Sequence, residues 1–464
     1  MTELTMNLEP HSSRPMYEQI YEYMKREIQT GGLPFKEKLP STRKLSAYLQ
    51  VSRSTVELAY EQLLSEGYIE SVPCKGYFVS ELEGLCRMER QEQKLVPDEL
   101  PRDQYEYDFS PNGVDLDSFP HSAWKKLSRK ILMDDNKELF MLGAPQGEEV
   151  LRKAIARYLH QARGVNCHPS QIIIGAGTDY LLMLLCAIWG KRCRIAMENP
   201  TYRRAYRVLK GLSNDMTVVD MDKDGMDVEA LEKSGAQVAY VMPSHQYPLG
   251  TVMPLKRRMQ LLKWAGEMEG RYIIEDDYDS EFRYKGKPIP ALQGYDRREC
   301  VIYLGTFSKS IAPAIRVSYL VLPGKLYQLY KERGRIFSST VSRVDQMIIA
   351  AFLQEGYFER HLNKMRAVYK SRHDLLLEEL RTIPGIRVLG EHAGVHLLVE
   401  LQNGMTEKEA LDRAKQAGIR IYGLSDYYVE PPKIPVRPTV ILGYANVKEE
   451  EMKAALSRLR NLWK

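Results

Sequence analysis

The 464-residue sequence has few cysteines, no long apolar run and no large excess of charge of one sign. Its six cysteines are scattered and none forms a CxxC pair, which argues against a disulfide framework or a zinc site and fits a reducing cytoplasm. The longest strongly apolar run, residues 180–189, is too short to cross a bilayer. The first residues lack the basic start and apolar core of a signal peptide. We therefore expect a cytoplasmic protein without a membrane span.

The charge balance does not by itself indicate a nucleic-acid binder. The chain has 66 basic and 61 acidic residues, and its first 80 residues hold 9 basic against 10 acidic side chains. Hydrophobic residues make up 44% and charged residues 27%, which is typical of soluble globular proteins. A chain of this length suits two or three domains. A role in DNA binding must therefore rest on the local arrangement of residues.

Residues 14–80 have the pattern of a winged helix-turn-helix. Apolar residues recur at helical spacing over residues 16–28, and Ser41 and Ser52 can each cap a following helix. Residues 68–79 then read YIESVPCKGYFV, two short strands around a turn. Three helices and a hairpin of this size predict a small DNA-binding module.

The basic and hydroxyl side chains of this module gather along one edge. The start of its third helix, from Ser52 to Thr55, would enter the major groove, where Arg53 can reach a phosphate or a guanine. Arg43 and Lys75 lie on the preceding helix and at the tip of the hairpin. Taken one at a time, such residues can also be exposed charges and ordinary helix caps. Taken together, they favour a DNA-binding surface.

The remainder of the chain divides into a charged segment and a large α/β domain. Residues 81–106 hold eight acidic and four basic residues without periodicity, and we predict a linker there. Over residues 107–464, helical patterns alternate with short β-branched or aromatic runs, which predicts a mostly parallel sheet covered by helices. From about residue 345, a long helical stretch and two later strand patterns predict a smaller α+β subdomain.

The sharpest chemical signal is GTFSKS, residues 305–310, in which Lys309 follows the end of an apolar strand. A lysine that forms a Schiff base needs a confined site in which its amine can be neutral. Thr306, Ser308 and Arg316 could hold a phosphate dianion beside it. The end of a strand is also where open α/β sheets bind ligands. Taken alone, however, a Ser-Lys-Ser run is more often an exposed turn.

A second signal is YIIEDDYDSEF, residues 272–282, an apolar strand that runs into clustered carboxylates. A pyridoxal ring needs an anion at its pyridine nitrogen to keep that nitrogen protonated. Asp276 is our candidate for that anion, and the phenol of Tyr278 could bond the ring hydroxyl. A magnesium site or plain solvated acids are the alternatives. No histidine cluster accompanies the acids, which disfavours zinc, and we predict no metal ligands.

Three further turns supply candidate ligand contacts. In the turn IIIGAGTD, the backbone N–H groups of Gly177, Thr178 and Asp179 would hold phosphate at a helix N-terminus. Tyr202 could stack on a cofactor ring, and Arg204 could face a ligand carboxylate. His245, in a polar turn after another strand, is a candidate pocket residue. Each of these could also be an ordinary turn residue, because βα turns of this composition are common.

These motifs resemble two known families in chain order. LPSTR, VSRSTV and a GY-then-wing pattern within residues 39–79 resemble the DNA-binding domain of the GntR regulators. Residues 107–464, with IIIGAGT, PSHQYPLG, IEDDYDSEF and GTFSKS, look like a fold-type I aminotransferase. The whole chain is therefore similar to the MocR/GabR subfamily of GntR regulators, in which a winged helix is fused to an aminotransferase-like domain.

The resemblance implies pyridoxal 5′-phosphate as cofactor, with Lys309 as the aldimine lysine. The other cofactor contacts would be Asp276 at the pyridine nitrogen, Tyr278 at the ring hydroxyl, Tyr202 against the ring, and Thr178, Thr306 and Arg316 at the phosphate. The DNA contacts would be Ser41, Arg43, Ser52, Arg53, Thr55 and Lys75. The resemblance also implies a head-to-tail homodimer.

The sequence departs from this pattern at four positions. Tyr247 stands where aminotransferases commonly carry asparagine, and Ile441 replaces a carboxylate-binding arginine. Asp426 stands where the GABA-responsive member has arginine, and Asp179 replaces the usual glutamine. The exchange of arginine for aspartate reverses the charge that would meet a ligand carboxylate, which disfavours GABA as effector. Asp426 could instead bind a second ammonium or be exposed, whereas Arg204 remains for a carboxylate.

The sequence thus predicts a transcriptional regulator that binds a double-stranded DNA operator. It would sense an amine, an amino acid or pyridoxal phosphate itself through Lys309. The candidate effector contacts are Arg204, His245 and Asp426. An active aminotransferase with an appended DNA-binding domain is the main alternative, and a cofactor-free dimerisation scaffold is a third.

Overall fold

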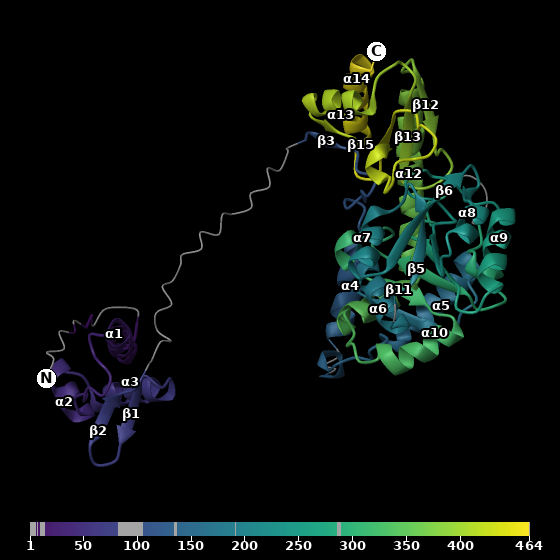
Figure 1. Cartoon of the computed structure of the whole chain (residues 1–464). Coiled ribbons are helices and arrows are strands. Elements are labelled where there is room, and N and C mark those ends of the chain that lie inside the picture. Colours follow the sequence, from purple (N-terminus) through teal and green to yellow (C-terminus); the bar gives the residue numbers. More distant parts are fainter. Residues whose placement is uncertain are drawn as a thin grey trace. The chain divides into compact units, whose positions relative to one another are not determined.

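Two compact units make up the chain, Met1–Arg102 and Asp103–Lys464. The computed structural model (Figure 1) describes residues 6, 8–9, 14–81, 105–133, 137–190, 192–284 and 289–463. Most of the predicted linker, residues 81–106, lies outside the described residues. Within the described ranges, no helix combines the length and the apolar character needed to cross a bilayer.

The first unit is a winged helix-turn-helix, which confirms the prediction. It consists of α1 (Met16–Thr30), α2 (Thr42–Leu49), α3 (Arg53–Ser65) and an antiparallel hairpin of β1 (Ile69–Val72) and β2 (Gly76–Val79). The predicted caps are present: the Ser41 hydroxyl accepts from the backbone N–H of Lys44 (3.2 Å), and the Ser52 hydroxyl accepts from that of Thr55 (3.1 Å). The three helices and the hairpin enclose one apolar core.

The second unit has a large α/β part and a smaller α+β part. Its α-helices are α4 (His121–Leu132), α5 (Glu149–Arg163), α6 (Thr178–Trp189), α7 (Arg203–Gly211), α8 (Val228–Lys233), α9 (Leu255–Gly266), α10 (Gly324–Leu329), α11 (Arg343–Gln354), α12 (Tyr357–Arg381), α13 (Glu407–Gln416) and α14 (Glu449–Leu462). Its strands are β3 (Tyr107–Asp108), β4 (Ile172–Gly175), β5 (Arg194–Asn199), β6 (Asp215–Asp222), β7 (Gly225–Met226), β8 (Val238–Val241), β9 (Tyr272–Asp277), β10 (Val301–Thr306), β11 (Ser318–Val321), β12 (Ile386–Leu389), β13 (His396–Leu401), β14 (Ile419–Arg420), β15 (Tyr422–Gly423) and β16 (Thr439–Gly443).

An eight-stranded sheet forms the centre of the α/β part, in the order β4-β11-β10-β9-β8-β5-β6-β7. The five strands from β10 to β6 in this order run parallel, whereas β11 and β7 are antiparallel to their neighbours. Helices cover both faces of the sheet. Successive side chains of a strand point to opposite faces, so Ile173 packs with α6, while Ile172 and Ile174 pack with α5 on the other face. The predicted α/β fold with a mostly parallel sheet is thereby confirmed.

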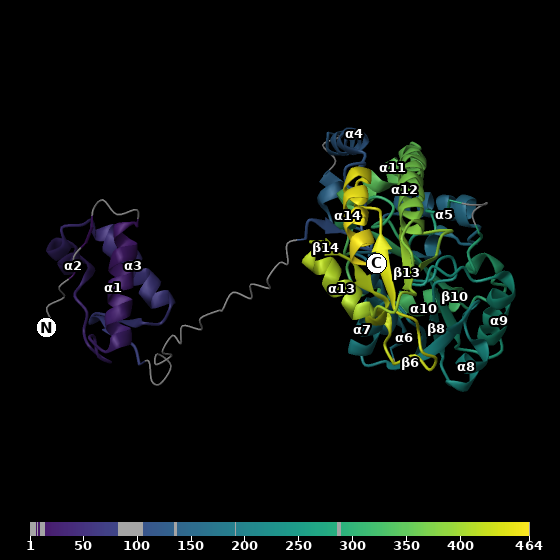
Figure 2. The ribbon, with the colours of Figure 1, turned by 90° about the horizontal axis from the view of Figure 1, so that it is seen from above.

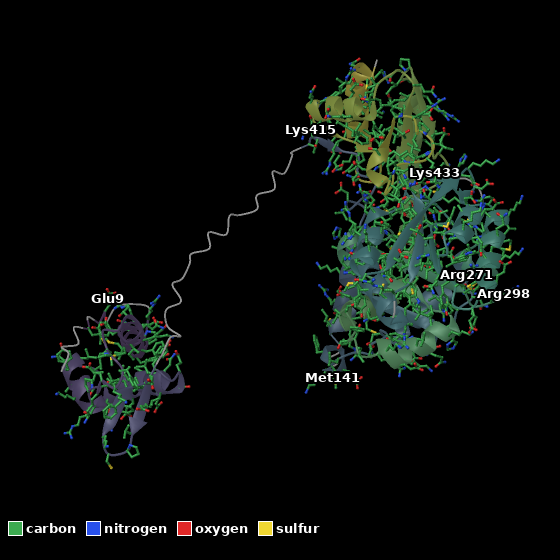
Figure 3. All side chains as sticks on the ribbon, viewed as in Figure 1. Glu9, Met141, Arg271, Arg298, Lys415 and Lys433 are labelled. Carbon is green, nitrogen blue, oxygen red and sulfur yellow. The ribbon has the colours of Figure 1, made fainter. Side chains whose placement is uncertain are left out.

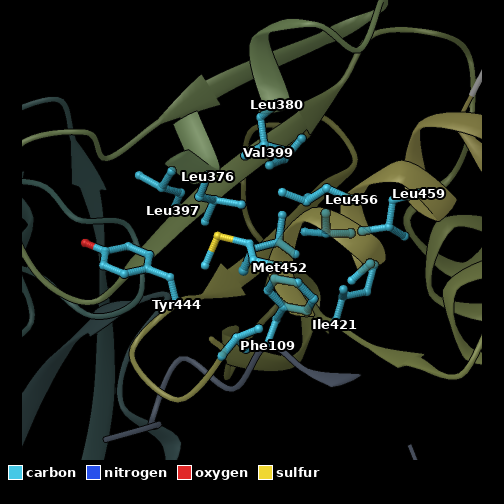
Figure 4. Packing of buried hydrophobic residues seen from close by; sticks show 14 of the residues in the cluster. Phe109, Leu376, Leu380, Leu397, Val399, Ile421, Tyr444, Met452, Leu456 and Leu459 are labelled. Atoms are coloured by element: carbon cyan, nitrogen blue, oxygen red, sulfur yellow. The ribbon is translucent and has the colours of Figure 1, made fainter. Parts of the chain in front are cut away.

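The smaller part begins later than the predicted residue 345. Helix α11 packs beside α4 and α5, and its buried residues belong to the core of the large part (Figure 2). The separate core begins within α12 and is completed by α13, α14 and the antiparallel sheet β12-β13-β16-β15. Figure 4 shows its packing, in which Leu376 and Leu380 of α12 lie near Leu397 and Val399 of β13. The long helix α12 therefore links the two parts.

Candidate functional site

Most of the predicted cofactor residues line one cavity of the second unit. It lies at the carboxyl ends of the parallel strands β5, β9 and β10, where open α/β sheets bind ligands. Its lining residues are Asn112, Thr178, Asp179, Tyr202, Arg204, Met242, Tyr247, Asp276, Tyr278, Thr306, Ser308, Lys309, Arg316 and Ser318.

Lys309 lies in the loop after β10 and lines this cavity. Its Nζ donates to Asn112 Oδ1 (3.2 Å) and to the backbone carbonyl of Pro111 (3.4 Å). Burial lowers the pKa of the Lys309 ammonium to about 8, although the charge of Asp279 acts in the opposite direction. Part of the Lys309 population is therefore neutral near pH 7, and a neutral amine can attack an aldehyde.

An anion cradle forms beside Lys309 at the N-terminus of α6. Gly177 precedes the helix with φ 92°, and a Cβ at this position would lie 2.3 Å from Arg316 Nη2. A side chain at this position would therefore push the guanidinium away from the first turn of the helix. The Thr306 hydroxyl accepts from the backbone N–H of Ser308 (3.1 Å), which orders the neighbouring loop. A helix N-terminus and an arginine together supply the donors and positive charge that a phosphate requires.

Asp179 contacts both arginines of the cavity. Its Oδ2 accepts a hydrogen bond from Arg204 Nη2 and lies 3.6 Å from Arg316 Nη2. The Asp179 side chain is 23% exposed, against 61% for Arg204. Arg204, which we expected to face a ligand carboxylate, thus lines the cavity with its guanidinium already paired.

Asp276 is buried at the end of β9. Its Oδ2 accepts a hydrogen bond from the hydroxyl of Tyr240, on the neighbouring strand β8. Burial raises the pKa of Asp276 to about 7; the Tyr240 bond opposes this rise, and the charges of Asp277 and Asp279 add to it. A cation facing this carboxyl would lower its pKa again, and a protonated pyridine nitrogen is such a cation.

Tyr278 lines the cavity, and His245 lies behind it. His245 Nδ1 is 2.9 Å from the Tyr278 hydroxyl and 2.9 Å from Asp279 Oδ2. The His245 side chain is 2% exposed, and a Cβ on Gly394 of the smaller part would lie 1.9 Å from its ring. The structure therefore puts His245 among the supports of Tyr278, and not on the cavity lining where we expected an effector contact.

Tyr202 and Tyr247 form an aromatic wall of the cavity. Their ring centroids are 5.9 Å apart, and the ring of Tyr427, from the smaller part, lies 5.3 Å from that of Tyr247. The Tyr247 hydroxyl donates to the Tyr427 hydroxyl (3.1 Å) and accepts from Asn112 Nδ2 (3.3 Å). Tyr247 thus connects the loop that contacts Lys309 with the smaller part of the unit.

Two positions that depart from the family patterns, Asp426 and Ile441, lie off the cavity lining. Asp426 is exposed in the short helix Leu424–Tyr427, and its backbone carbonyl accepts from Arg203 Nη1 (2.7 Å). Ile441 is fully buried in β16, where it packs with Leu398 and Leu424. The contacts within this unit therefore do not support an effector contact through Asp426.

The predicted DNA contacts all belong to the first unit; they are Ser41, Arg43, Ser52, Arg53, Thr55 and Lys75. The side chains of Arg43, Arg53 and Lys75 are exposed. Arg53 Nε pairs with Glu57 Oε1 (2.7 Å), one turn further along α3. Exposed cations at a helix start and at a hairpin turn are suited to contact phosphates.

Comparison with known proteins decides the family. Residues 107–459 match Aminotransferase class I and II, and residues 16–79 match Bacterial regulatory proteins, gntR family. The probable rhizopine catabolism regulatory protein MocR of Rhizobium meliloti is 32% identical, over 96% of this chain and 93% of its own. The chain belongs to the MocR/GabR subfamily of GntR regulators.

Other relatives agree with this membership of the MocR/GabR subfamily. The uncharacterized HTH-type transcriptional regulator YhdI of Bacillus subtilis is 38% identical, over 99% of this chain and 98% of its own. The HTH-type pyridoxine biosynthesis transcriptional regulator PdxR of Corynebacterium glutamicum is 31% identical, over 92% of both chains. Among solved structures, the multiple substrate aminotransferase from Thermococcus profundus has a TM-score of 0.68 and 27% identity, over 77% of this chain and 91% of its own.

Pyridoxal 5′-phosphate is the cofactor of the aminotransferase class I and II family, and the cavity of this MocR/GabR-type chain fits it. The amine of Lys309 suits its aldehyde, the cradle of Gly177 and Arg316 suits its phosphate, and the buried carboxyl of Asp276 suits its pyridine nitrogen. Across the part of the chain that the structure describes, no group of three or more His, Cys, Asp or Glu residues is arranged to hold a metal ion.

Sequence reasoning missed Asn112, Tyr240 and Asp279. Asn112 belongs to no motif, and it meets Lys309 across 197 residues of sequence. Tyr240 lies in a strand that we predicted, but its bond to Asp276 depends on β8 lying beside β9. Asp279 could have been found, because it follows Tyr278 in the acidic run.

Proposed function

We propose that this protein is a pyridoxal phosphate-dependent transcriptional regulator. It binds operator DNA through residues 14–80 and responds to an amine, an amino acid or the cofactor itself through Lys309. The observation that carries the proposal is that Lys309, Asp276, Tyr278 and Arg316 line one cavity in a chain that also has a winged helix.

When bound, the cofactor supplies an aldehyde that reacts reversibly with amines. Lys309 contributes an amine that is partly neutral near pH 7, because burial lowers its pKa. Asp276 keeps a proton at the pyridine nitrogen, and Tyr278 donates to the ring hydroxyl. Arg316 and the N-terminus of α6 hold the phosphate and so fix the position of the ring.

An effector changes DNA binding only if it binds one arrangement of the protein better than another. Lys309 bonds Asn112, Asn112 bonds Tyr247, and Tyr247 bonds Tyr427 of the smaller part. A free Lys309 amine makes the first of these bonds, so joining Nζ to the cofactor, or its release by a ligand, would change this bond. We propose this chain of contacts as the route from the cavity to the smaller part.

The test combines a visible absorption spectrum of the protein loaded with pyridoxal phosphate and DNA gel shifts, with amines, amino acids and dipeptides added in turn. A regulator gives a cofactor band that one ligand shifts without conversion to the pyridoxamine form, together with a change in DNA affinity. Lys309→Ala is the control and should lose the band. DNA binding that ignores the cofactor and every amine overturns the sensing role.

An active aminotransferase with an appended DNA-binding domain is the second candidate. It is favoured by the fold shared with the Thermococcus profundus aminotransferase and by the presence of Lys309 and Asp276 in one cavity. A lysine and a proton-holding carboxylate suffice in principle for proton transfer at an amino donor. Sustained turnover of an amino donor with a keto acid would establish this function. A cofactor-free scaffold, the third possibility, predicts no cofactor band at all.

We also propose a head-to-tail homodimer. Large apolar side chains are exposed at the end of α4 and in the short helix and turn that follow: Leu132, Met133, Phe140, Met141 and Leu142. Figure 3 labels Met141 at one end of the second unit. Exposed apolar groups that gather in this way are typical of protein interfaces. Light scattering should give twice the mass of the chain, and Phe140→Asp should shift the protein toward monomer.

A further inference from the structure

The charges around the cavity restrict the kind of effector that it can take. Arg204 and Arg316 are the arginines among the lining residues, and Asp179 contacts both. Asp179 lies in the first turn of α6, where the helix dipole stabilises a carboxylate. Within the Arg204–Asp179 ion pair, the Asp179 side chain is the more buried one. Asp179 therefore holds the exposed Arg204 side chain in place.

When the cofactor phosphate is bound at Arg316, the phosphate balances the charge of Arg316 and Asp179 balances the charge of Arg204. The described lining residues also include the uncharged Asn112, Tyr202 and Tyr247. A ligand carboxylate would therefore find no unpaired arginine among the described lining residues. To reach Arg204, it would have to break the Arg204–Asp179 contact and leave three anions close together, and these like charges repel one another.

We infer that the effector is a primary amine that carries no carboxylate and has an apolar or aromatic body. The amine is recognised at Lys309, and the body packs against the rings of Tyr202 and Tyr247, which form the cavity wall. This inference rests on the proposed function and narrows its ligand from amines and amino acids in general to carboxylate-free amines. Asp179 is the residue that sets the preference, because it occupies Arg204.

The experiment uses the full-length protein loaded with pyridoxal phosphate and three matched ligand pairs: tyramine and tyrosine, phenylethylamine and phenylalanine, butylamine and norvaline. The members of each pair differ only in the carboxylate. The readouts are the ligand concentration that half-shifts the cofactor band and the DNA affinity at saturating ligand. We expect each effective amine to act at a concentration at least about tenfold lower than its amino acid.

Two substitutions test whether the Arg204–Asp179 contact causes the preference for amines. Asp179→Asn should release Arg204 and reduce or reverse the preference by about tenfold, through tighter binding of the amino acid. Arg204→Gln should keep the preference for amines, because it leaves the Asp179 carboxylate in place. Asp215→Asn is the matched control: it removes a carboxylate that pairs with Arg194 (2.6 Å) on the surface, away from the cavity, and should leave the preference unchanged.

The outcomes separate this inference from the function on which it rests. Amino acids that act as well as their amines would overturn the inference, while a ligand-sensitive cofactor band upholds the function. An unchanged preference in Asp179→Asn would overturn the role of Asp179. If no cofactor band forms, both the function and the inference are wrong.

Discussion

At the scale of single residues, Gly177 leaves room for the Arg316 guanidinium beside the N-terminus of α6. A methyl group at this position would lie 2.3 Å from the guanidinium, on a backbone with φ 92°. We expect Gly177→Ala to weaken the binding of pyridoxal phosphate by about 10- to 100-fold, because the phosphate loses a charged hydrogen bond. A fluorescence or absorption titration of the purified protein measures this loss.

Gly404→Ala is the control for that change. Gly404 has a similar backbone angle, φ 83°, but a Cβ there meets open space. The Gly404→Ala substitution therefore introduces a similar backbone strain without displacing an arginine, and cofactor affinity should be unchanged. Equal losses in the two variants would mean that strain, and not the cradle, lowers the affinity.

We expect a second residue, Glu198, to make the free energy of unfolding depend on pH. It is fully buried in β5, and burial raises its pKa from 4.5 to about 8. The folded protein thus keeps a proton that the unfolded chain releases, so the free energy of unfolding should fall as pH rises from about 4.5 to 8. Asp276, with a pKa near 7, acts in the same direction.

We expect Glu198→Gln to flatten this dependence, because glutamine remains neutral. Urea unfolding at pH 6 and pH 8 measures it: the contribution of Glu198 is on the order of 1 kcal/mol per pH unit in the wild type and absent in the variant. A variant whose stability falls with pH as steeply as the wild type would show that Glu198 is not the group responsible.

At the scale of elements, helix α3 begins with an exposed arginine, Arg53, for which we predict a DNA contact. Arg53 pairs with Glu57 (2.7 Å) but keeps 65% of its side chain exposed. We expect Arg53→Ala to lower DNA affinity severalfold and to reduce the salt slope of binding by about one, because one phosphate contact is lost. Fluorescence anisotropy at several salt concentrations measures both quantities.

Lys153 of α5 provides a matched control for Arg53. It pairs with Glu149 (2.6 Å) one turn away and is 62% exposed, as Arg53 is on α3, but it lies on the second unit. Lys153→Ala should leave affinity and salt slope unchanged. An unaltered slope in Arg53→Ala would instead place the DNA contacts elsewhere on the winged helix.

At the scale of the whole molecule, the two units have separate cores. We expect calorimetry of the full chain to show two unfolding transitions. Pyridoxal phosphate should raise the temperature of one of them only, because a ligand stabilises the part that binds it. Lys309→Ala should greatly reduce that rise. A single transition, or equal shifts of both, would mean that the units unfold together.

The elements and the chemistry of the cofactor residues could be predicted from the sequence, because both depend on neighbours a few positions away. Helical spacing and the caps at Ser41 and Ser52 indicate the winged helix, and alternating helical and apolar runs indicate the α/β sheet. Lys309 and Asp276 could be singled out because each lies at or shortly after the end of an apolar strand, which is the ligand-binding edge of such a sheet.

Which distant residues meet was decided only by tertiary packing. Asn112 reaches Lys309 across 197 residues because separate loops converge on one cavity. His245 lies behind Tyr278 and not on the lining, since a glycine of the smaller part packs against its ring. Asp179 neutralises Arg204 because α6 and α7 lie side by side. The spacing of residues in the sequence does not predict such contacts, because they join elements whose separation along the chain is unrelated to their distance in the fold.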